Sequence, residues 1–187
     1  MNLSTLVPSA DVLVQQCLNG EHTAYRLLYD RYAKAMYNTA LRMVNCTSDA
    51  EDILQEAFTD AFQQLKNFEG KSTFGAWLKQ IVVYKSITHL KKQKLLLADI
   101  EPDADKLADE EPLQEDFVWY TVDLIKQAVQ TLPDGYRTVL TLHLFEGHDQ
   151  EEVAEIMQVA HSTVRTQYMR AKQKLLQVLK KGEVYEQ

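Results

Sequence analysis

The chain has few cysteines, glycines and prolines, and it has no long apolar run. Its 187 residues include two cysteines, six glycines and four prolines. Glycine and proline punctuate chains built from short strands and turns, so their scarcity disfavours that architecture. The apolar residues recur instead at helical spacing. Because no run approaches the ~18–20 apolar residues that span a bilayer, membrane insertion of a helix is excluded.

The cysteines and the first residues bear on the compartment. Two isolated cysteines in a helical chain, Cys17 and Cys46, are typical of reduced core thiols rather than of a disulfide. The opening stretch, MNLSTLVPSADVL, has no basic region before an apolar one, so no export signal is expected. We therefore expect a cytoplasmic protein.

The net charge of −7 by itself argues against a nucleic-acid partner, but the acidic residues are unevenly distributed along the chain. Asp99–Asp116 holds nine acidic residues and one lysine, a charge of −8. The flanking parts are close to neutral, so each can carry a local basic face. With two prolines, dense like charge and no apolar stripe, residues 96–116 are predicted to be a flexible acidic linker between domains at 8–95 and 117–182.

The first of these domains is predicted to contain four helices. Ser9 can cap a short helix that ends at Leu18, and a long helix follows over residues 21–44. Ser48 and Glu51 have the spacing of a capping box that opens a third helix, running to about Lys66. A fourth helix is expected from Ser72 or Thr73 to about Lys94.

The second domain is predicted to end in a helix-turn-helix. A helix carrying Trp119 and Val122 should end at Leu132, and Pro133 suits the first turn of the next helix. Asp149 and Glu152 form another capping box, which opens a helix of about two turns. An amphipathic helix follows about three residues later, as in DNA-binding helix-turn-helix units. The core positions are expected to be Val153, Ile156, Val159, Val164 and Tyr168.

The outward face of that last helix suits a DNA major groove. Arginine can bond guanine edges and methionine can touch a thymine methyl, which gives readout roles to Ser162, Thr166, Met169 and Arg170. Phosphate contacts are expected from Thr163, Arg165 and Lys172. The same face is also compatible with an ordinary solvated helix. Two positions depart from the usual turn, with Gln158 where glycine is common and Ala160 where serine is common.

Two surfaces of the first domain also invite a functional interpretation. The third helix has an apolar face and an acidic face, and the acidic face is either simply solvated or a docking surface for a basic partner. The fourth helix has an apolar stripe of Val83, Ile87 and Leu90, which is enough to pack it. Its other stripe, from Phe74 to Thr88, would then be an aromatic surface beside lysines, suited to unpaired bases. In the alternative interpretation Phe74, Trp77 and Ile81 are core and the lysines only aid solubility.

Together these segments resemble an extracytoplasmic-function sigma factor of the sigma-70 family. The resemblance rests on DAEDILQEAFTDAFQQL, then NFEGKSTFGAWLKQIVVYKSITHLKK, the acidic stretch, and LPDGYRTVLTLHLFEGHDQEEVAEIMQVAHSTVRTQYMRAKQKL. It implies an all-α fold with two small helical domains joined by a flexible acidic linker. It also implies core RNA polymerase and promoter DNA as partners, an anti-sigma factor, and no membrane insertion.

The resemblance assigns the candidate site residues. Those that would dock on the clamp helices of the polymerase are Asp49, Glu51, Asp52, Gln55 and Glu56. The loop that would capture a flipped base of the −10 element includes Lys66, Asn67, Phe68, Lys71 and Ser72. The surface that would engage melting DNA includes Trp77, Tyr84, Lys85, Thr88, Lys91 and Lys92, with Tyr84 where the family often has asparagine. The helix-turn-helix would read the −35 element, and its domain would grip the polymerase flap.

Two other functional classes fit the sequence less well. A stand-alone dimeric helix-turn-helix regulator would leave the acidic helix and the aromatic-lysine helix without a purpose. An enzyme is disfavoured because there is no glycine-rich phosphate loop, and because His143 and His148 are five apart with no CxxC motif nearby. No catalytic residue, cofactor or metal is therefore predicted.

Overall fold

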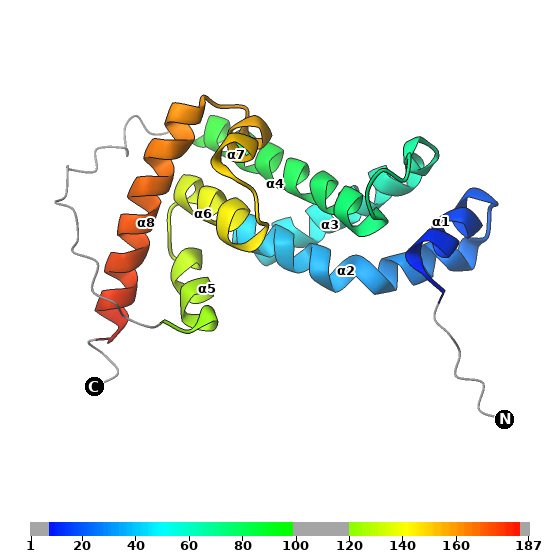
Figure 1. The fold of residues 1–187 in the computed structure, drawn as a ribbon, viewed down its shortest axis with the longest axis horizontal. Coiled ribbons are helices and arrows are strands. Elements are labelled where there is room, and N and C mark those ends of the chain that lie inside the picture. The colour runs from blue at the N-terminus through cyan, green and yellow to red at the C-terminus, as the bar shows by residue number, and fades with distance from the viewer. Residues whose placement is uncertain (1–7, 99–119, 184–187) are drawn as a thin grey trace. The chain divides into compact units, whose positions relative to one another are not determined.

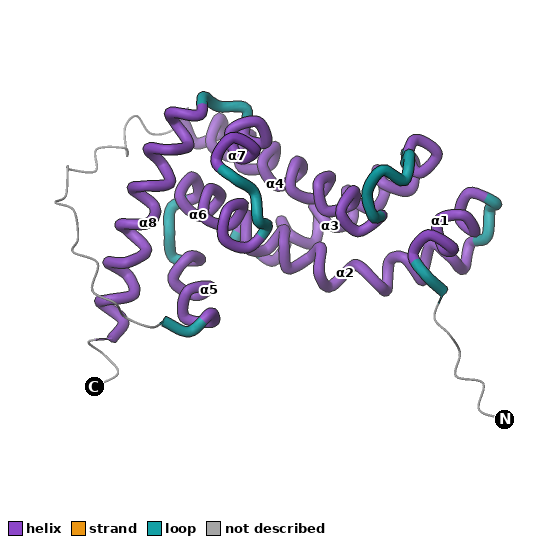
Figure 2. Tube along the Cα trace, viewed as in Figure 1, coloured by secondary structure: helices purple, strands orange, loops and turns teal. Residues whose placement is uncertain are grey.

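The protein is all-α over the residues that the computed structural model describes, which are 8–98 and 120–183 (Figures 1 and 2). The chain divides into two compact units, Met1–Ser86 and Ile87–Gln187. The fold class predicted from the sequence is confirmed for this part of the chain. The predicted acidic linker lies outside the described residues from 99 to 116, and the domain boundaries at 8–95 and 117–182 stay a prediction.

The N-terminal unit is built from α1 (Ala10–Leu18), α2 (His22–Val44), α3 (Thr47–Gln63), the short 3-10 turn η1 (Leu65–Asn67) and the first part of α4 (Phe74–Ala98). Ser9 caps α1 as predicted, because its hydroxyl accepts a hydrogen bond from the Val12 amide at 3.3 Å. The helices bury a continuous core, whose largest fully buried members are Leu13, Leu28, Met43, Leu65, Phe74, Leu78 and Val82.

The start of α3 differs from the prediction. Asn45 ends α2 in the left-handed region, with φ 54°, and Cys46 is extended, so the chain has already turned when it reaches Thr47. The helix therefore begins at Thr47 with Cys46 at the cap position, two residues before Ser48, so Ser48 cannot serve as its cap. The Ser48 hydroxyl lies instead 3.2 Å from Cys46 Sγ. The capping box predicted for Ser48 and Glu51 is wrong, although the helix that it was expected to open is present.

The C-terminal unit contains α5 (Val122–Gln130), α6 (Asp134–Leu140), the π-helical segment η2 (Thr141–Phe145), α7 (Gln150–Met157) and α8 (His161–Glu183). Helix α8 packs against α5, α6 and α7. Pro133 lies at the cap position of α6 rather than inside its first turn. Trp119 lies outside the described residues. Part of the core is formed by Val129, Leu132, Leu140, Ala171, Leu175 and Leu179.

The helix-turn-helix of the C-terminal unit is set by α7, a short turn and α8. The capping box at α7 is confirmed: the Asp149 carboxylate accepts from the Glu152 amide at 2.8 Å, and Glu152 accepts from the Asp149 amide at 2.9 Å. Val153 and Val164 are fully buried, as predicted, and Ile156 and Tyr168 are partly buried. Val159 was expected in the core but is 37% exposed, because it lies in the turn itself.

The turn places Gln158 in a left-handed conformation, with φ 56°. A residue with a Cβ adopts this region at a cost of about 1–2 kcal/mol, whereas glycine does so freely. Glycine also loses more entropy on folding, which offsets about half of the gain. We predict that Gln158→Gly stabilises the C-terminal unit by about 0.5–1 kcal/mol, measured by urea unfolding of the full chain. Gln158→Ala is the control and should give no such gain; equal stabilisation by both would contradict the backbone explanation.

Candidate nucleic-acid interface

The seven residues predicted to contact DNA from the helix-turn-helix all lie exposed on α8. They share a side because Val164, Ala171 and Leu175 bury the opposite side against the unit's core. Met169 keeps 55% of its surface exposed, so its apolar side chain is accessible on this face. The exposed residues are Ser162, Thr163, Arg165, Thr166, Met169, Arg170 and Lys172. The structure thus presents polar, cationic and apolar groups together along one helix face.

A surface hollow of about 360 Å³ lies at the start of this face. Its lining includes the predicted contacts Ser162, Thr163, Thr166 and Arg170, together with Tyr136 and Gln167. Neither Tyr136 nor Gln167 was predicted to contact DNA, since Tyr136 belongs to the apolar pattern of α6 and Gln167 carries no charge. Hydroxyl, amide and guanidinium groups here face the same space, which suits hydrogen bonding to a polar ligand such as a DNA edge.

The loop from Lys66 to Ser72 is held on the N-terminal unit by aromatic packing. Phe68 packs on Trp77 with ring centroids 5.1 Å apart, and its edge meets Phe74 at 6.1 Å. Gly70 turns the loop with φ 68°. Around this anchor Lys66, Asn67, Lys71 and Ser72 are exposed, and Lys71 forms an ion pair with Glu69. The Trp77 ring is therefore partly exposed and at the same time supports the loop through its contact with Phe68.

Helix α4 corrects the interpretation of its aromatic stripe. Phe74 is fully buried, so it belongs to the core and not to a surface, as the alternative interpretation held. The buried face continues through Leu78 and Val82 and is joined by Val83 and Ile87. Tyr84 is 59% exposed, Lys91 and Lys92 are exposed, and Trp77 and Thr88 are partly buried. The aromatic surface that remains consists of Trp77 and Tyr84.

The predicted docking residues lie along α3. Glu51, Asp52, Gln55 and Glu56 are exposed, and Asp49 in the first turn is partly buried. Ile53, Leu54, Ala57 and Phe58 bury the other side of the same helix. Carboxylates near a helix N-terminus are favoured by the helix dipole, which helps to explain why this end of α3 tolerates several. The face can attract a basic partner over a distance of about 10 Å in moderate salt.

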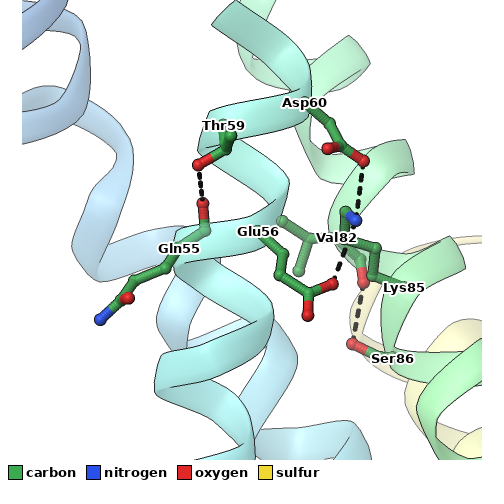
Figure 3. Close-up of polar contacts among 7 residues, drawn as sticks. All are labelled: Gln55, Glu56, Thr59, Asp60, Val82, Lys85 and Ser86. Carbon is green, nitrogen blue, oxygen red and sulfur yellow. Dashed lines mark hydrogen bonds and ion pairs between the residues drawn. The ribbon is translucent and has the colours of Figure 1, made fainter. Parts of the chain in front are cut away.

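Lys85 links this acidic face to α4 (Figure 3). Its Nζ lies 2.7 Å from Asp60 Oδ2 and 3.2 Å from Glu56 Oε2, and its side chain is only 18% exposed. Partial burial lowers the pKa of Lys85, but hydrogen bonds and charges from Asp60 and Glu56 outweigh that effect and raise the pKa above 10.5. The stabilisation from a raised pKa is complete below about pH 10.5 and is lost as the pH rises through the folded-state value. Lys85 is therefore charged and paired at neutral pH.

Over residues 8–98 and 120–183, no group of three or more histidine, cysteine or acidic side chains is arranged to hold a metal ion. Within the same ranges, no helix is long and apolar enough to cross a membrane.

Comparison with known proteins identifies the family. The model described as Sigma-70 region 2 matches residues 28–95, and Sigma-70, region 4 matches residues 123–175. The RNA polymerase sigma-H factor of Pseudomonas aeruginosa is 31% identical over 175 residues, which cover 86% of this chain and 89% of that protein. The ECF RNA polymerase sigma-E factor of Escherichia coli K12 is 30% identical, covering 87% and 90%. The chain belongs to the extracytoplasmic-function sigma factors of the sigma-70 family.

The sigma factor also has relatives of known structure. The sigma factor RpoE of Bartonella quintana, solved in complex with the anti-sigma factor NepR, superposes with a TM-score of 0.54 at 23% identity, covering 83% of this chain and 96% of that one. This likeness concerns the fold. As a sigma factor, the chain is a transcription initiation factor that directs promoter-specific initiation, with core RNA polymerase and promoter DNA as its partners.

We predict that the Phe68 ring fixes the loop of the sigma factor. Phe68→Ala should lower the free energy of unfolding of the N-terminal unit by about 1–3 kcal/mol, since half-buried aromatic packing is lost. Amide hydrogen exchange should also speed up over residues 66–72. The exposed neighbour provides the control, and Lys66→Ala should change stability by less than about 0.5 kcal/mol. Unchanged exchange in Phe68→Ala would show that the loop is held by other contacts.

Proposed function

We propose that this sigma factor divides promoter recognition between its two units. The α3 face, with Asp49, Glu51, Asp52, Gln55 and Glu56, docks on the clamp helices of core polymerase. The loop at Lys66–Ser72 and the exposed part of α4 capture the −10 element, and α8 reads the −35 element. The observation that carries this proposal is that each matched sigma-70 region presents an exposed face opposite its buried stripe.

We propose that the −10 element is opened by binding of its bases once they have become unpaired. Unstacking and unpairing a base costs a few kcal/mol, and a phosphate-binding loop to use ATP is absent from the sequence. Stacking on an aromatic side chain returns about 1–3 kcal/mol per base, and on α4 the Tyr84 ring is exposed and the Trp77 ring is partly exposed. Tyr84 would stack where an asparagine would hydrogen-bond, so it shapes the preference at this element.

The −35 element is proposed to be read as a duplex by α8. Met169 and Arg170 are placed for base edges, while Thr163, Arg165 and Lys172 contact phosphates. The apolar helices of the same unit grip the polymerase flap. Because the two DNA-binding units belong to one chain, binding of one unit to its element raises the effective concentration of the other unit at its own element, provided that the two elements are suitably spaced.

The partners and the compartment complete the proposal. We propose that an anti-sigma factor covers these surfaces when transcription is not required, a proposal supported by the complex that the Bartonella quintana relative forms with an anti-sigma factor. The sigma factor acts in the cytoplasm and acts by binding alone, while the polymerase carries out the catalysis. A stand-alone dimeric regulator is not favoured, since it would give the acidic face of α3 no partner.

Reconstitution with core polymerase tests the proposal. The wild-type chain with core polymerase should start transcription at promoters that neither component uses alone. Glu51→Gln together with Asp52→Asn should weaken polymerase binding by roughly tenfold, with a smaller loss at high salt, because two exposed attractive charges are removed. Glu151→Gln with Glu155→Gln removes the same charge from α7 and should have little effect. Equal losses of polymerase affinity in both double variants would mean that only the net charge matters, and would reject the docking face.

Arg170 should discriminate between bases. We predict that Arg170→Ala weakens holoenzyme binding to a cognate −35 element by about 1–3 kcal/mol and relaxes the preference at one base position. Selection from a library randomised over the −35 element measures both effects. Lys172→Ala is the comparison, since loss of a phosphate contact should weaken all sequences alike. A uniform loss in Arg170→Ala would show that this side chain contacts only phosphate.

A further inference from the structure

Two proposed surfaces meet at the side chain of Lys85. The family resemblance assigns Lys85 to the DNA surface of α4 and Glu56 to the polymerase-docking face of α3. In the structure the ammonium of Lys85 is bonded to Glu56 and, at the shorter distance of 2.7 Å, to Asp60 (Figure 3). Asp60 lies on the same acidic face of α3 but is not among the docking residues that the resemblance assigns. The lysine assigned to DNA is thus held by α3, the helix whose exposed face is proposed to dock on the polymerase.

The geometry explains why this arrangement is stable. Glu56 and Asp60 are four residues apart on α3, so their carboxylates are neighbours and repel each other. A cation between them relieves that repulsion. Asp60 is the firmer partner, since its side chain is 40% exposed, whereas that of Glu56 is 67% exposed and its pairing is more strongly screened. The Ser86 hydroxyl, beside Lys85, donates a hydrogen bond to the Val82 carbonyl at 2.8 Å.

For Lys85 to bind a DNA phosphate, its ammonium must leave both carboxylates, and those carboxylates must then lie beside the incoming phosphate. That change exchanges two attractive pairs for one and adds like-charge repulsion. Lys92, further along the same helix, is exposed and is not opposed by such a pair among the contacts of the described residues. The two lysines therefore differ in availability, although the sequence gives them the same role.

We propose that Glu56 and Asp60 form a carboxylate clamp that withholds Lys85 from DNA in the free sigma factor. The inference rests on the proposed function, because it concerns the same α4 surface. It names the clamp, and Asp60 in particular, as a positioning element for DNA binding. It predicts that Lys85 contributes little to DNA binding by the free chain.

The clamp is tested by titrating the free full-length chain with a labelled single-stranded oligonucleotide at low salt. Lys92→Met should weaken binding by roughly two- to fivefold, as expected for loss of one phosphate contact, while Lys85→Met should leave it unchanged. Glu56→Gln with Asp60→Asn should tighten binding by more than the same change at Glu51 and Asp52, which do not touch Lys85. Adding Lys85→Met to the Glu56 and Asp60 pair should remove that excess.

Two results would overturn the clamp. One is an equal loss in Lys85→Met and Lys92→Met, which would mean that Lys85 already contacts DNA in the free chain. The other is an excess tightening that survives Lys85→Met, which would mean that the acids repel DNA without holding the lysine. Circular dichroism melts confirm that each variant is folded, and Lys85→Arg retains the cation if Lys85→Met is unstable. Promoter-directed initiation by wild-type holoenzyme is measured separately, so failure of the clamp and failure of the proposed function are distinguished.

Discussion

Burial of one stripe on each helix is the constraint on which both units depend. Each unit has only a few helices, so a helix that packs on one side leaves its other side in solvent. On α8, Val164, Ala171 and Leu175 fill the core, and the angular positions that remain include Thr166, Met169 and Arg170. On α3 the same division leaves a row of acids exposed. The proposed contacts are therefore consequences of packing: the core fixes which residues a partner can reach.

The sequence predicted most where one helix carries one stripe. The periodicity of α3, α7 and α8 gave their buried and exposed faces, and the Asp149–Glu152 pattern gave a cap that the structure contains. It predicted least well on α4, which is apolar on more than one side. Phe74, Leu78 and Val82 form one buried line and Val83 and Ile87 another. Spacing alone could not decide which line faced the core, because either one satisfies the helical period.

Two further differences arise from information that a local pattern does not hold. The Ser48 cap failed because the left-handed Asn45 and the extended Cys46 had already started the helix, and capping depends on that preceding backbone. The environment of Lys85 was missed because its partner Glu56 is 29 residues away in sequence. A lysine near aromatic residues has the same sequence signature whether its ammonium is free or paired, so only the packing of α3 beside α4 separates the two cases.

The ion pairs of Lys85 also constrain how the two proposed interactions relate. Glu56 is among the proposed docking residues and is at the same time a partner of Lys85, so a cation from the polymerase would compete with Lys85 for one carboxylate. Linkage requires that competition to act in both directions: whatever draws Glu56 away from Lys85 makes the lysine more available, and whatever draws Lys85 away makes Glu56 more available. Asp60, being the closer partner, limits the size of this effect because it keeps hold of the lysine when Glu56 leaves. The coupling expected from this geometry is thus favourable but small.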